Sequence, residues 1–295
     1  MIHLSMLVNK IFFIVISAFL FSSSVAQTKK DKRLQKRIET LITGFQGDIG
    51  VYVKDIKRNR VVAINADTVF PTASMVKIPI LVGVMDKIER GELRYHDDVI
   101  YKDSLLYEGV DILGSFKNDE KIELSKVMML MLTMSDNTAS LWLQSLAGTG
   151  TRINQILDSI GFEHTKVNSR TPGREVNRSI YGWGQTTPRE MSELVLKIYR
   201  HKIFTANASN RMMRLLGRNH WDENALSVIP PTIQVFSKNG AVNTSRSEVI
   251  LVNAPKRPYV FCISTKNNKD ERWTPDNEAW QLARRISKIL WDNFN

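Results

Sequence analysis

Residues near both ends of the chain alternate between apolar and polar positions, which is the period of a β-strand. Residues 49–53 show this alternation, a Lys57-Arg58-Asn59 turn follows, and a second apolar run comes directly after it. We therefore expect an antiparallel hairpin. Three more strand-like runs come late in the chain, at 233–236, 249–252 and 259–264. The pattern predicts one sheet that draws its strands from both ends of the chain.

Apolar residues at helical spacing predict helices at both ends and through the middle of the chain. The terminal helices have apolar stripes that begin at Leu34 and Ala279, and a third helix begins at Ser74 and continues into an apolar segment. Residues 124–134 are apolar on almost every side, which is typical of a buried helix. Further helical patterns lie at 138–147, at 152–160 and after Thr187, which is followed by Pro188 and Glu190 in the manner of an N-cap.

Two stretches, 91–121 and 161–187, lack periodicity and are expected to be loops. Loops as long as the second one are often functional. Together the elements predict an α/β (α+β) fold, with a mainly antiparallel sheet, flanking terminal helices and an all-helical lobe. The sheet lobe would comprise about 27–70 and 228–295, and the helical lobe about 71–227.

The first residues have the pattern of a secretory signal peptide. Lys10 precedes a short apolar run, and small residues at Ser24 and Ala26 suit cleavage after residue 26. The alternative is a membrane anchor, but the apolar run is too short to span about 30 Å of hydrocarbon comfortably. We expect residues 1–26 to be removed, no stable membrane anchor to remain, and the protein to lie in the periplasm or outside the cell.

Composition narrows the possible partners. Removing residues 1–26 from the 295-residue chain leaves 269, which suits one large domain, and we expect a monomer. Cys262 is the single cysteine and lies in an apolar run, so it is most simply a core residue. The net charge of +11 is spread along the chain without a nucleic-acid motif, which excludes that partner class and favours anionic substrates or polymers. We expect neither a metal nor a cofactor.

Candidate chemistry begins at Ser74, which is the one serine with a lysine, Lys77, three residues later. Residues three apart share a helix face, so the amine would lie within reach of the hydroxyl. A lysine that is partly removed from water has a lowered pKa and can activate a serine nucleophile. The helix N-terminus would add N–H donors for a developing oxyanion. By itself a single Ser-x-x-Lys is expected by chance in a chain of this length.

Two more motifs follow in the chain. Ser135-Asp136-Asn137 ends the apolar helix, and Lys238-Asn239-Gly240 ends an apolar strand. Alone, the first is typical of a helix N-cap and the second of a strand-to-turn transition. In this order, however, Ser-x-x-Lys, Ser-Asp-Asn and Lys-Thr-Gly mark class A β-lactamases and penicillin-binding proteins. The chain resembles that superfamily over nearly all of its mature length, and class A β-lactamases with their serine hydrolase relatives most closely.

The resemblance implies a role for each motif residue. Ser74 would attack a strained amide and become acylated, Lys77 would accept its proton directly or by relay, and Ser135 would pass a proton to the departing nitrogen. Asn137 would orient the substrate's side-chain amide and help to hold Lys77. Lys238 would lower the pKa of Lys77 and attract the substrate carboxylate.

The remaining family positions imply the binding groups. The backbone N–H groups of Ser74 and Ala241 would form an oxyanion hole. Gly240, on the same strand, would line the substrate site. Arg246, eight residues after Lys238, is a candidate second contact for the carboxylate, or alternatively a surface charge.

The sequence departs from the family pattern twice. Asn239 replaces a threonine whose hydroxyl usually meets the substrate carboxylate. The loop glutamate that activates water for deacylation falls on Pro172 or on Gly173, depending on the alignment, and neither side chain is a base. Glu175 is the acid in this loop that another register would bring to the site; otherwise it is a solvated charge or an arginine partner.

Three functions are compatible with these residues. The leading one is a secreted serine β-lactamase that hydrolyses the β-lactam amide through a Ser74 acyl-enzyme. The second is a D,D-peptidase or esterase-like serine hydrolase of cell-wall substrates. The third is a β-lactam-binding domain that is acylated but deacylates poorly, because water lacks its general base.

Overall fold

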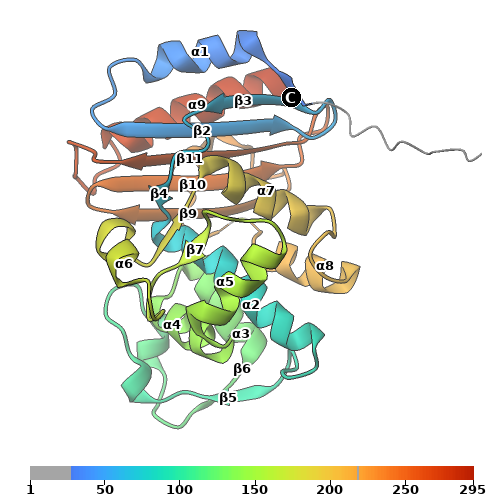
Figure 1. Ribbon diagram of the computed structural model, residues 1–295, viewed down its shortest axis with the longest axis vertical. Helices are drawn as coiled ribbons and strands as arrows, with labels where there is room; N and C mark the ends of the chain where they lie inside the picture. The colour runs from blue at the N-terminus through green and yellow to red at the C-terminus, as the bar shows by residue number, and fades with distance from the viewer. Residues whose placement is uncertain (1–27, 218) are drawn as a thin grey trace, which may run out of the picture.

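The computed structural model describes residues 28–217 and 219–295 and contains one six-stranded sheet (Figure 1). The strand order is β1-β3-β2-β11-β10-β9, and only the short β1–β3 pair is parallel. The predicted α/β class with a mainly antiparallel sheet is therefore confirmed. The bounds are β1 (Lys29–Lys30), β2 (Asp48–Asp55), β3 (Arg60–Ile64), β9 (Val235–Val242), β10 (Ser245–Val252) and β11 (Tyr259–Lys266).

The chain ends meet inside this sheet. Strand β2 pairs with β11, so Tyr259 lies opposite Asp55 and Phe261 opposite Val53. The hairpin predicted from residues 49–53 is present as β2 and β3. Cys262 is buried in the core, as predicted.

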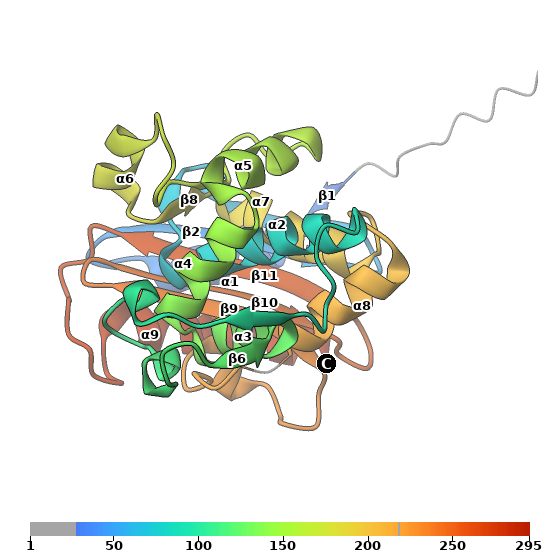
Figure 2. The same ribbon diagram turned by 90° about the horizontal axis from the view of Figure 1, so that it is seen from below.

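Helices cover both faces of the sheet (Figures 1 and 2). On one face lie α1 (Lys32–Ile42) and α9 (Glu278–Phe294), and on the other lies α7 (Pro188–Tyr199). Successive side chains of β10 face opposite sides of the sheet and therefore belong to two parts of the core. Ile250 packs with the terminal helices, whereas Val249 packs with the helices from the middle of the chain. Thr187 caps α7 by accepting from the Glu190 amide at 3.1 Å, as the sequence predicts.

The middle of the chain folds into the helices in the lower half of Figure 1. These are α2 (Lys77–Glu89), α3 (Leu124–Met129), a π-helical turn η4 (Leu130–Met134), α4 (Asn137–Leu146), α5 (Thr149–Ser159), α6 (Glu175–Tyr181) and α8 (Ala206–Leu215). Short 3₁₀ turns are η1 (Ala73–Val76), η2 (Asp103–Leu105), η3 (Ile112–Ser115) and η5 (Ala225–Val228). Small strands are β4 (Phe70–Pro71), β5 (Asp98–Ile100), β6 (Lys121–Glu123), β7 (Lys166–Val167) and β8 (Gly184–Thr186).

Three expectations need correction. The apolar run 124–134 is helical, but Met129 is 48% exposed, so one side faces solvent. The two stretches predicted to be loops are not structureless: β5, η2 and η3 lie within 91–121, and β7, α6 and β8 lie within 161–187. The late strands are longer than predicted: β9 continues past Gly240 to Val242, because the backbone ladder to β10 needs no apolar side chains.

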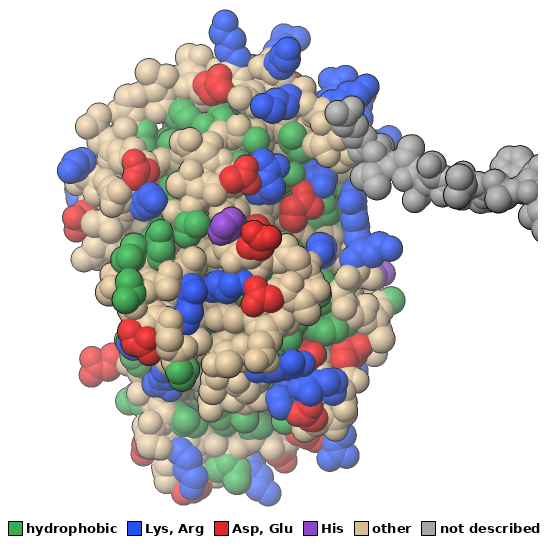
Figure 3. Space-filling view, in the orientation of Figure 1, with side chains coloured by type: hydrophobic (Ala, Val, Ile, Leu, Met, Phe, Trp, Pro, Cys, Tyr) green, Lys and Arg blue, Asp and Glu red, His purple; other side chains and the backbone are tan. Residues whose placement is uncertain are grey.

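The predicted signal peptide lies outside the described residues. Within the described part of the chain, no helix is both long and apolar enough to cross a membrane. The division into a sheet lobe and a helical lobe at the stated residues stays a prediction. Lysine and arginine side chains are spread among acidic ones on the face drawn in Figure 3, in keeping with a charge that is not gathered into one patch.

Candidate active site

Ser74 lies on the 3₁₀ turn η1, directly before α2. This turn is held at its start, where the Thr72 amide donates to the Gly184 carbonyl at 2.9 Å and the Met75 amide donates to the Thr72 carbonyl at 3.0 Å. Helix α2 then begins at Lys77 and is buried along most of its length. The sequence predicts Ser74 at a helix start, and it occupies the short turn that leads into the helix.

The Lys77 amine is within hydrogen-bond distance of three other residues of the first two motifs. Its Nζ lies 3.0 Å from Ser74 Oγ, 3.0 Å from Ser135 Oγ, 2.7 Å from the Ser135 carbonyl oxygen and 3.0 Å from Asn137 Oδ1. The Lys77 side chain is wholly buried. An amine in this position bridges η1 to the start of α4.

Burial controls the charge of this amine. Removal from water lowers the pKa of Lys77 well below its ordinary value, and the charge of Lys238 lowers it further, whereas Asp136 acts in the opposite direction. Burial likewise lowers the pKa of Lys238 to about 7, opposed by the charge of Glu248. The surroundings of Lys77 thus favour its uncharged form, which is the form that can accept a proton.

Ser135 takes its position from an unusual backbone. It ends η4 in the left-handed conformation, with φ of 62°, a region that residues other than glycine seldom adopt. Asp136 then caps α4, because its buried carboxylate accepts from the Ala139 amide at 2.7 Å and from the Leu113 amide at 2.9 Å. This motif is therefore a helix cap as well as a source of site residues.

The third motif runs along the open edge of the sheet, since β9 is its last strand. The Ser237 amide donates away from the sheet, to the Leu216 carbonyl at 2.7 Å. Hydrogen-bonding direction alternates along a strand, so the N–H of Ala241, four residues on, faces the same open edge. A Cβ on Gly240 would stand 2.6 Å from the Ser74 amide nitrogen, which shows how closely this edge approaches η1.

Two adjoining hollows, of about 510 and 350 Å³, meet above Ser74 and share Asn137 and Ala241. Ser135, Asn239 and Gly240 line the larger one, and Tyr107 and Trp183 line the smaller one. Four of the six tryptophans in the chain line one or the other hollow: Trp183, Trp221, Trp273 and Trp280.

Lys238 lies beneath the larger hollow. Its Nζ donates to the Asn239 carbonyl at 2.9 Å and to Asn239 Oδ1 at 3.2 Å, so the asparagine that replaces the family threonine holds the lysine. Behind them Glu248 is buried opposite Asn239 and accepts from the Ala225 and Leu226 amides at 2.8 and 3.3 Å. Burial raises the pKa of Glu248 to about 7.

The structure does not direct Arg246 at the hollow. Its guanidinium donates to backbone carbonyls on both sides of the β9–β10 turn and on the segment before α9, including Val242, Asn243 and Arg272. The guanidinium also lies 4.6 Å from the Trp273 ring centroid. Arg246 is absent from the residues that line the two hollows. It therefore fixes loops around the site.

Glu175 is likewise not brought to Ser74. It is the exposed first residue of α6, and its carboxylate accepts from the Gly173 amide at 3.1 Å. Pro172 and Gly173 are also exposed. The part of α6 that reaches the smaller hollow is its other end, Ile180 and Tyr181. Among the described residues lining the two hollows, Glu223 is the one carboxylate.

The sequence analysis did not identify the four tryptophans that line the hollows, and it did not identify Glu248. The tryptophans come from segments without a motif, and the one available signal is that Trp221 and Trp273 lie in polar stretches where a large apolar side chain is unexpected. Glu248 gives a sharper signal, since an acid interrupts the run that becomes β10, a strand buried throughout.

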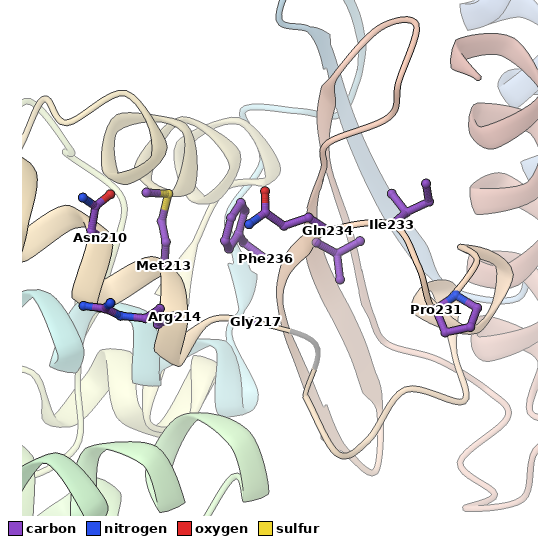
Figure 4. Close-up of a pocket in the computed structure, with 9 residues that line it drawn as sticks. Asn210, Met213, Arg214, Gly217, Pro231, Ile233, Gln234 and Phe236 are labelled. Carbon is purple, nitrogen blue, oxygen red and sulfur yellow. The ribbon is translucent and has the colours of Figure 1, made fainter.

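Another hollow, of about 450 Å³, lies between α8 and the beginning of β9 (Figure 4). Met213 and Arg214 approach it from α8, and Phe236 approaches it from β9. It contains none of the motif residues. No cluster of three or more histidine, cysteine, aspartate or glutamate side chains suited to a metal ion occurs within residues 28–217 and 219–295.

The chain is similar to known proteins in sequence and in fold. A sequence profile of the beta-lactamase enzyme family matches residues 33–294. Beta-lactamase VEB-1 of Pseudomonas aeruginosa is 22% identical over 301 residues, covering 98% of each chain, and a beta-lactamase of Streptomyces fradiae is 25% identical over 279 residues, covering 88% of this chain and 87% of that one. The solved structure of PBP-A has a TM-score of 0.80 at 23% identity, covering 90% of this chain and 97% of that one; a mutant of PBP-A has been solved as an acyl-enzyme complex with penicillin G.

The fold is that of the serine β-lactamase and penicillin-binding protein superfamily, and the three motifs that mark this superfamily meet around one hollow. The match over residues 33–294 goes one step further: this chain belongs to the beta-lactamase enzyme family.

Proposed function

We propose that this protein is a serine β-lactamase that forms an acyl-enzyme on Ser74 and then hydrolyses it. The observation that carries the proposal is the 3.0 Å contact between the buried Lys77 amine and Ser74 Oγ, below a hollow of about 510 Å³. A hydroxyl beside a base of lowered pKa is an activated nucleophile.

The partners of Lys77 support its role as the base. An uncharged amine has two N–H groups and one lone pair. The Ser135 carbonyl oxygen and Asn137 Oδ1 can only accept, so they take the two N–H groups. The lone pair then faces the Ser74 hydroxyl and accepts its proton as Oγ bonds to the lactam carbonyl carbon.

The remaining groups complete the acylation step. The carbonyl electron pair moves to oxygen, where the N–H groups of Ser74 and Ala241 stabilise it. When the C–N bond breaks, the nitrogen keeps the electron pair and takes a proton from Ser135 Oγ, which regains one from Lys77 at 3.0 Å. Lys238 and Asn239 would hold the substrate carboxylate. Ring opening leaves the whole lactam attached to Ser74 as an ester, which water cleaves to a carboxylic acid.

A second candidate has specific support, namely a β-lactam-binding protein that remains acylated. The Glu175 carboxylate is exposed and accepts a hydrogen bond from the Gly173 amide. No carboxylate from the stretch 161–187 lines either hollow. Deacylation without a general base loses roughly 10²–10⁴-fold in rate. Both candidates share the acylation step and differ in how long the ester persists.

One time course tests both candidates. The purified chain is mixed with penicillin and its intact mass is followed from seconds to hours, beside the hydrolysis of a chromogenic cephalosporin. A β-lactamase gains the mass of one penicillin and returns to its free mass with turnover, whereas the binding protein keeps the adduct. The Ser74→Ala variant is the control. A wild-type chain that stays unmodified and hydrolyses no cephalosporin, or equal modification of Ser74→Ala, rejects both candidates.

We also propose class A-type chemistry and export to the periplasm or the exterior, on the motif order and the pattern of residues 1–26. N-terminal sequencing of the protein from a cell-envelope or secreted fraction tests the export. The expected sequence begins at Gln27, and a chain that retains Met1 in the cytoplasmic fraction would contradict it.

A further inference from the structure

Trp273 combines high exposure with a fixed position. Its side chain belongs to the segment between β11 and α9 and is 64% exposed, more than any other phenylalanine, tyrosine or tryptophan among the described residues. Its Nε1 donates to Asn243 Oδ1 at 3.2 Å. One side of the ring lies 4.6 Å from the Arg246 guanidinium, which is itself fixed by backbone carbonyls. A large apolar ring held rigidly in water is a feature of binding sites.

Two further tryptophans face the same hollow. Trp280, from the first turn of α9, lies 5.9 Å from the Arg246 guanidinium. Trp221 is anchored from another segment, with its Nε1 donating to the Met134 carbonyl at 2.9 Å. All three line the hollow that contains Ser74, so rings from three separate segments form one wall. We call Trp221, Trp273 and Trp280 the tryptophan wall.

The neighbours of the wall identify the part of a substrate that it would meet. Ser135, the proton donor to the departing nitrogen, lines this hollow and is absent from the smaller one. Asn239, beside Lys238, also lines only this hollow. The acyl side chain of the substrate would instead enter the smaller hollow, beside Tyr107 and Trp183. The wall therefore borders the nitrogen and carboxylate end.

Charge narrows the chemistry of the bound group. Arg246 occupies one side of the Trp273 ring, and Glu223 places a carboxylate in the lining of the same hollow. A cation already stacked on an indole weakens its attraction for a second cation. The wall consequently suits a planar ring without a charge, because Arg246 disfavours a cation and Glu223 an anion, and stacking on an indole needs no particular hydrogen-bond pattern.

We propose that the tryptophan wall is a stacking subsite for an aromatic or heteroaromatic ring carried on the nitrogen side of the scissile amide. This inference rests on the proposed function and deepens it by naming a substrate class. The class comprises β-lactams whose carboxylate-bearing ring has a planar, uncharged substituent. Trp273 is the specificity-determining residue, since it is the most exposed member of the wall.

The test measures binding in a chain that cannot react. In the Ser74→Ala background, calorimetry gives Kd for two cephalosporins with the same acyl side chain and carboxylate. One carries a methyl group on the carboxylate-bearing ring, and the other carries an aromatic heterocycle there. We expect the heterocyclic compound to bind about fivefold more tightly. Trp273→Ala should abolish this ratio, and Trp273→Phe should retain most of it.

Trp183→Ala is the matched control, because Trp183 lines the smaller hollow and should alter both affinities by one factor. Equal affinity of the two compounds for the Ser74→Ala chain overturns the subsite. An equal loss of affinity for both compounds in Trp273→Ala also overturns the subsite, because Trp273 would then only shield Arg246 from solvent. Acylation of the wild-type chain in either case leaves the proposed function standing. Failure of both compounds to bind, with no acylation of the wild-type chain, rejects the subsite and the proposed function together.

Discussion

Gly240 lies against the backbone that leads into Ser74: a Cβ on Gly240 would stand 2.6 Å from the Ser74 nitrogen and 2.6 Å from the Thr72 carbonyl oxygen. Both neighbours are backbone atoms, which cannot rotate away as a side chain can. Only glycine therefore lets β9 approach η1 this closely. The approach brings the next residue along, Ala241, into the hollow that Ser74 lines.

The first prediction is that Gly240→Ala strongly slows acylation without unfolding the protein. The added methyl group would push β9 away from η1 and separate the two oxyanion donors. Loss of one such donor costs on the order of 10²–10³ in rate. We expect a fall of that size in the rate of adduct formation with penicillin, measured by intact mass.

Gly161→Ala is the control for this substitution. Gly161 has a φ of 88° and no atom within 4 Å of an added Cβ, so the change strains the backbone far from the site. It should lower the melting temperature and leave acylation intact. An acylation rate in Gly240→Ala equal to wild type would show that the contact does not set the geometry.

The second prediction concerns pH. The proposed mechanism requires an uncharged Lys77 and a charged Lys238, so kcat/KM for a carboxylate-bearing β-lactam should rise as pH increases through the pKa of Lys77. It should fall as pH increases through that of Lys238, which burial lowers to about 7. Glu248 raises the pKa of Lys238, so Glu248→Gln should move the alkaline limb to lower pH.

A methyl ester of the same β-lactam is the matched substrate for this measurement. It lacks the carboxylate, so its profile should lack the alkaline limb. The charged groups that act on the pKa of Lys77 are Lys238, which lowers it, and Asp136, which raises it; Glu248 raises the pKa of Lys238. An alkaline limb that stays in place, or moves to higher pH, in Glu248→Gln would contradict the assignment.

The third prediction separates the two functions of the Ser135-Asp136-Asn137 motif. Asp136 accepts from two buried amides, so Asp136→Ala leaves both without a partner and should lower the free energy of unfolding by about 3 kcal/mol. Thr205→Ala removes an ordinary cap, a single bond of 3.1 Å to the Ala208 amide, and should cost about 1 kcal/mol. Urea denaturation of both variants gives the comparison, and equal losses would argue against a special role for Asp136.

The fourth prediction is that Glu175→Gln leaves deacylation unchanged. The carboxylate is exposed, and its bond to the Gly173 amide can be kept by the glutamine oxygen. A general base would instead contribute roughly 10²–10⁴-fold. The lifetime of the penicillin adduct in wild type and variant decides between them; a lifetime lengthened by that factor would make Glu175 the base after all.

The spacing of Ser74 and Lys77 and the resemblance to the superfamily made much of the site predictable. The resemblance implied roles for Ser135, Asn137 and Lys238; the structure places Ser135 and Asn137 beside the Lys77 amine, and Lys238 beside Asn239, which lines the same hollow as Ser74. The helix cap at Thr187 depends only on a few neighbouring residues. Features of this kind can be predicted from the sequence.

The parts that escaped prediction depend on distant contacts. Spacing from Lys238 made Arg246 a candidate for the carboxylate, but carbonyls of Glu271 and Arg272 draw its guanidinium elsewhere. The continuation of β9 past Gly240 follows from pairing with β10, which no hydrophobic alternation announces. The tryptophan wall is assembled from three segments that only the complete fold brings together.

The pairing of β2 with β11 determines the stage of synthesis at which this protein can become active. Its two partners are separated by about two hundred residues, so the centre of the sheet cannot form until the C-terminal strand has been synthesised. Strand β9, with its lysine and its oxyanion donor, reaches the sheet only through β10 and β11. A chain that has not yet been synthesised as far as β11 therefore has Ser74 but lacks the sheet that positions β9 beside it, so we expect reactivity to require the last strand.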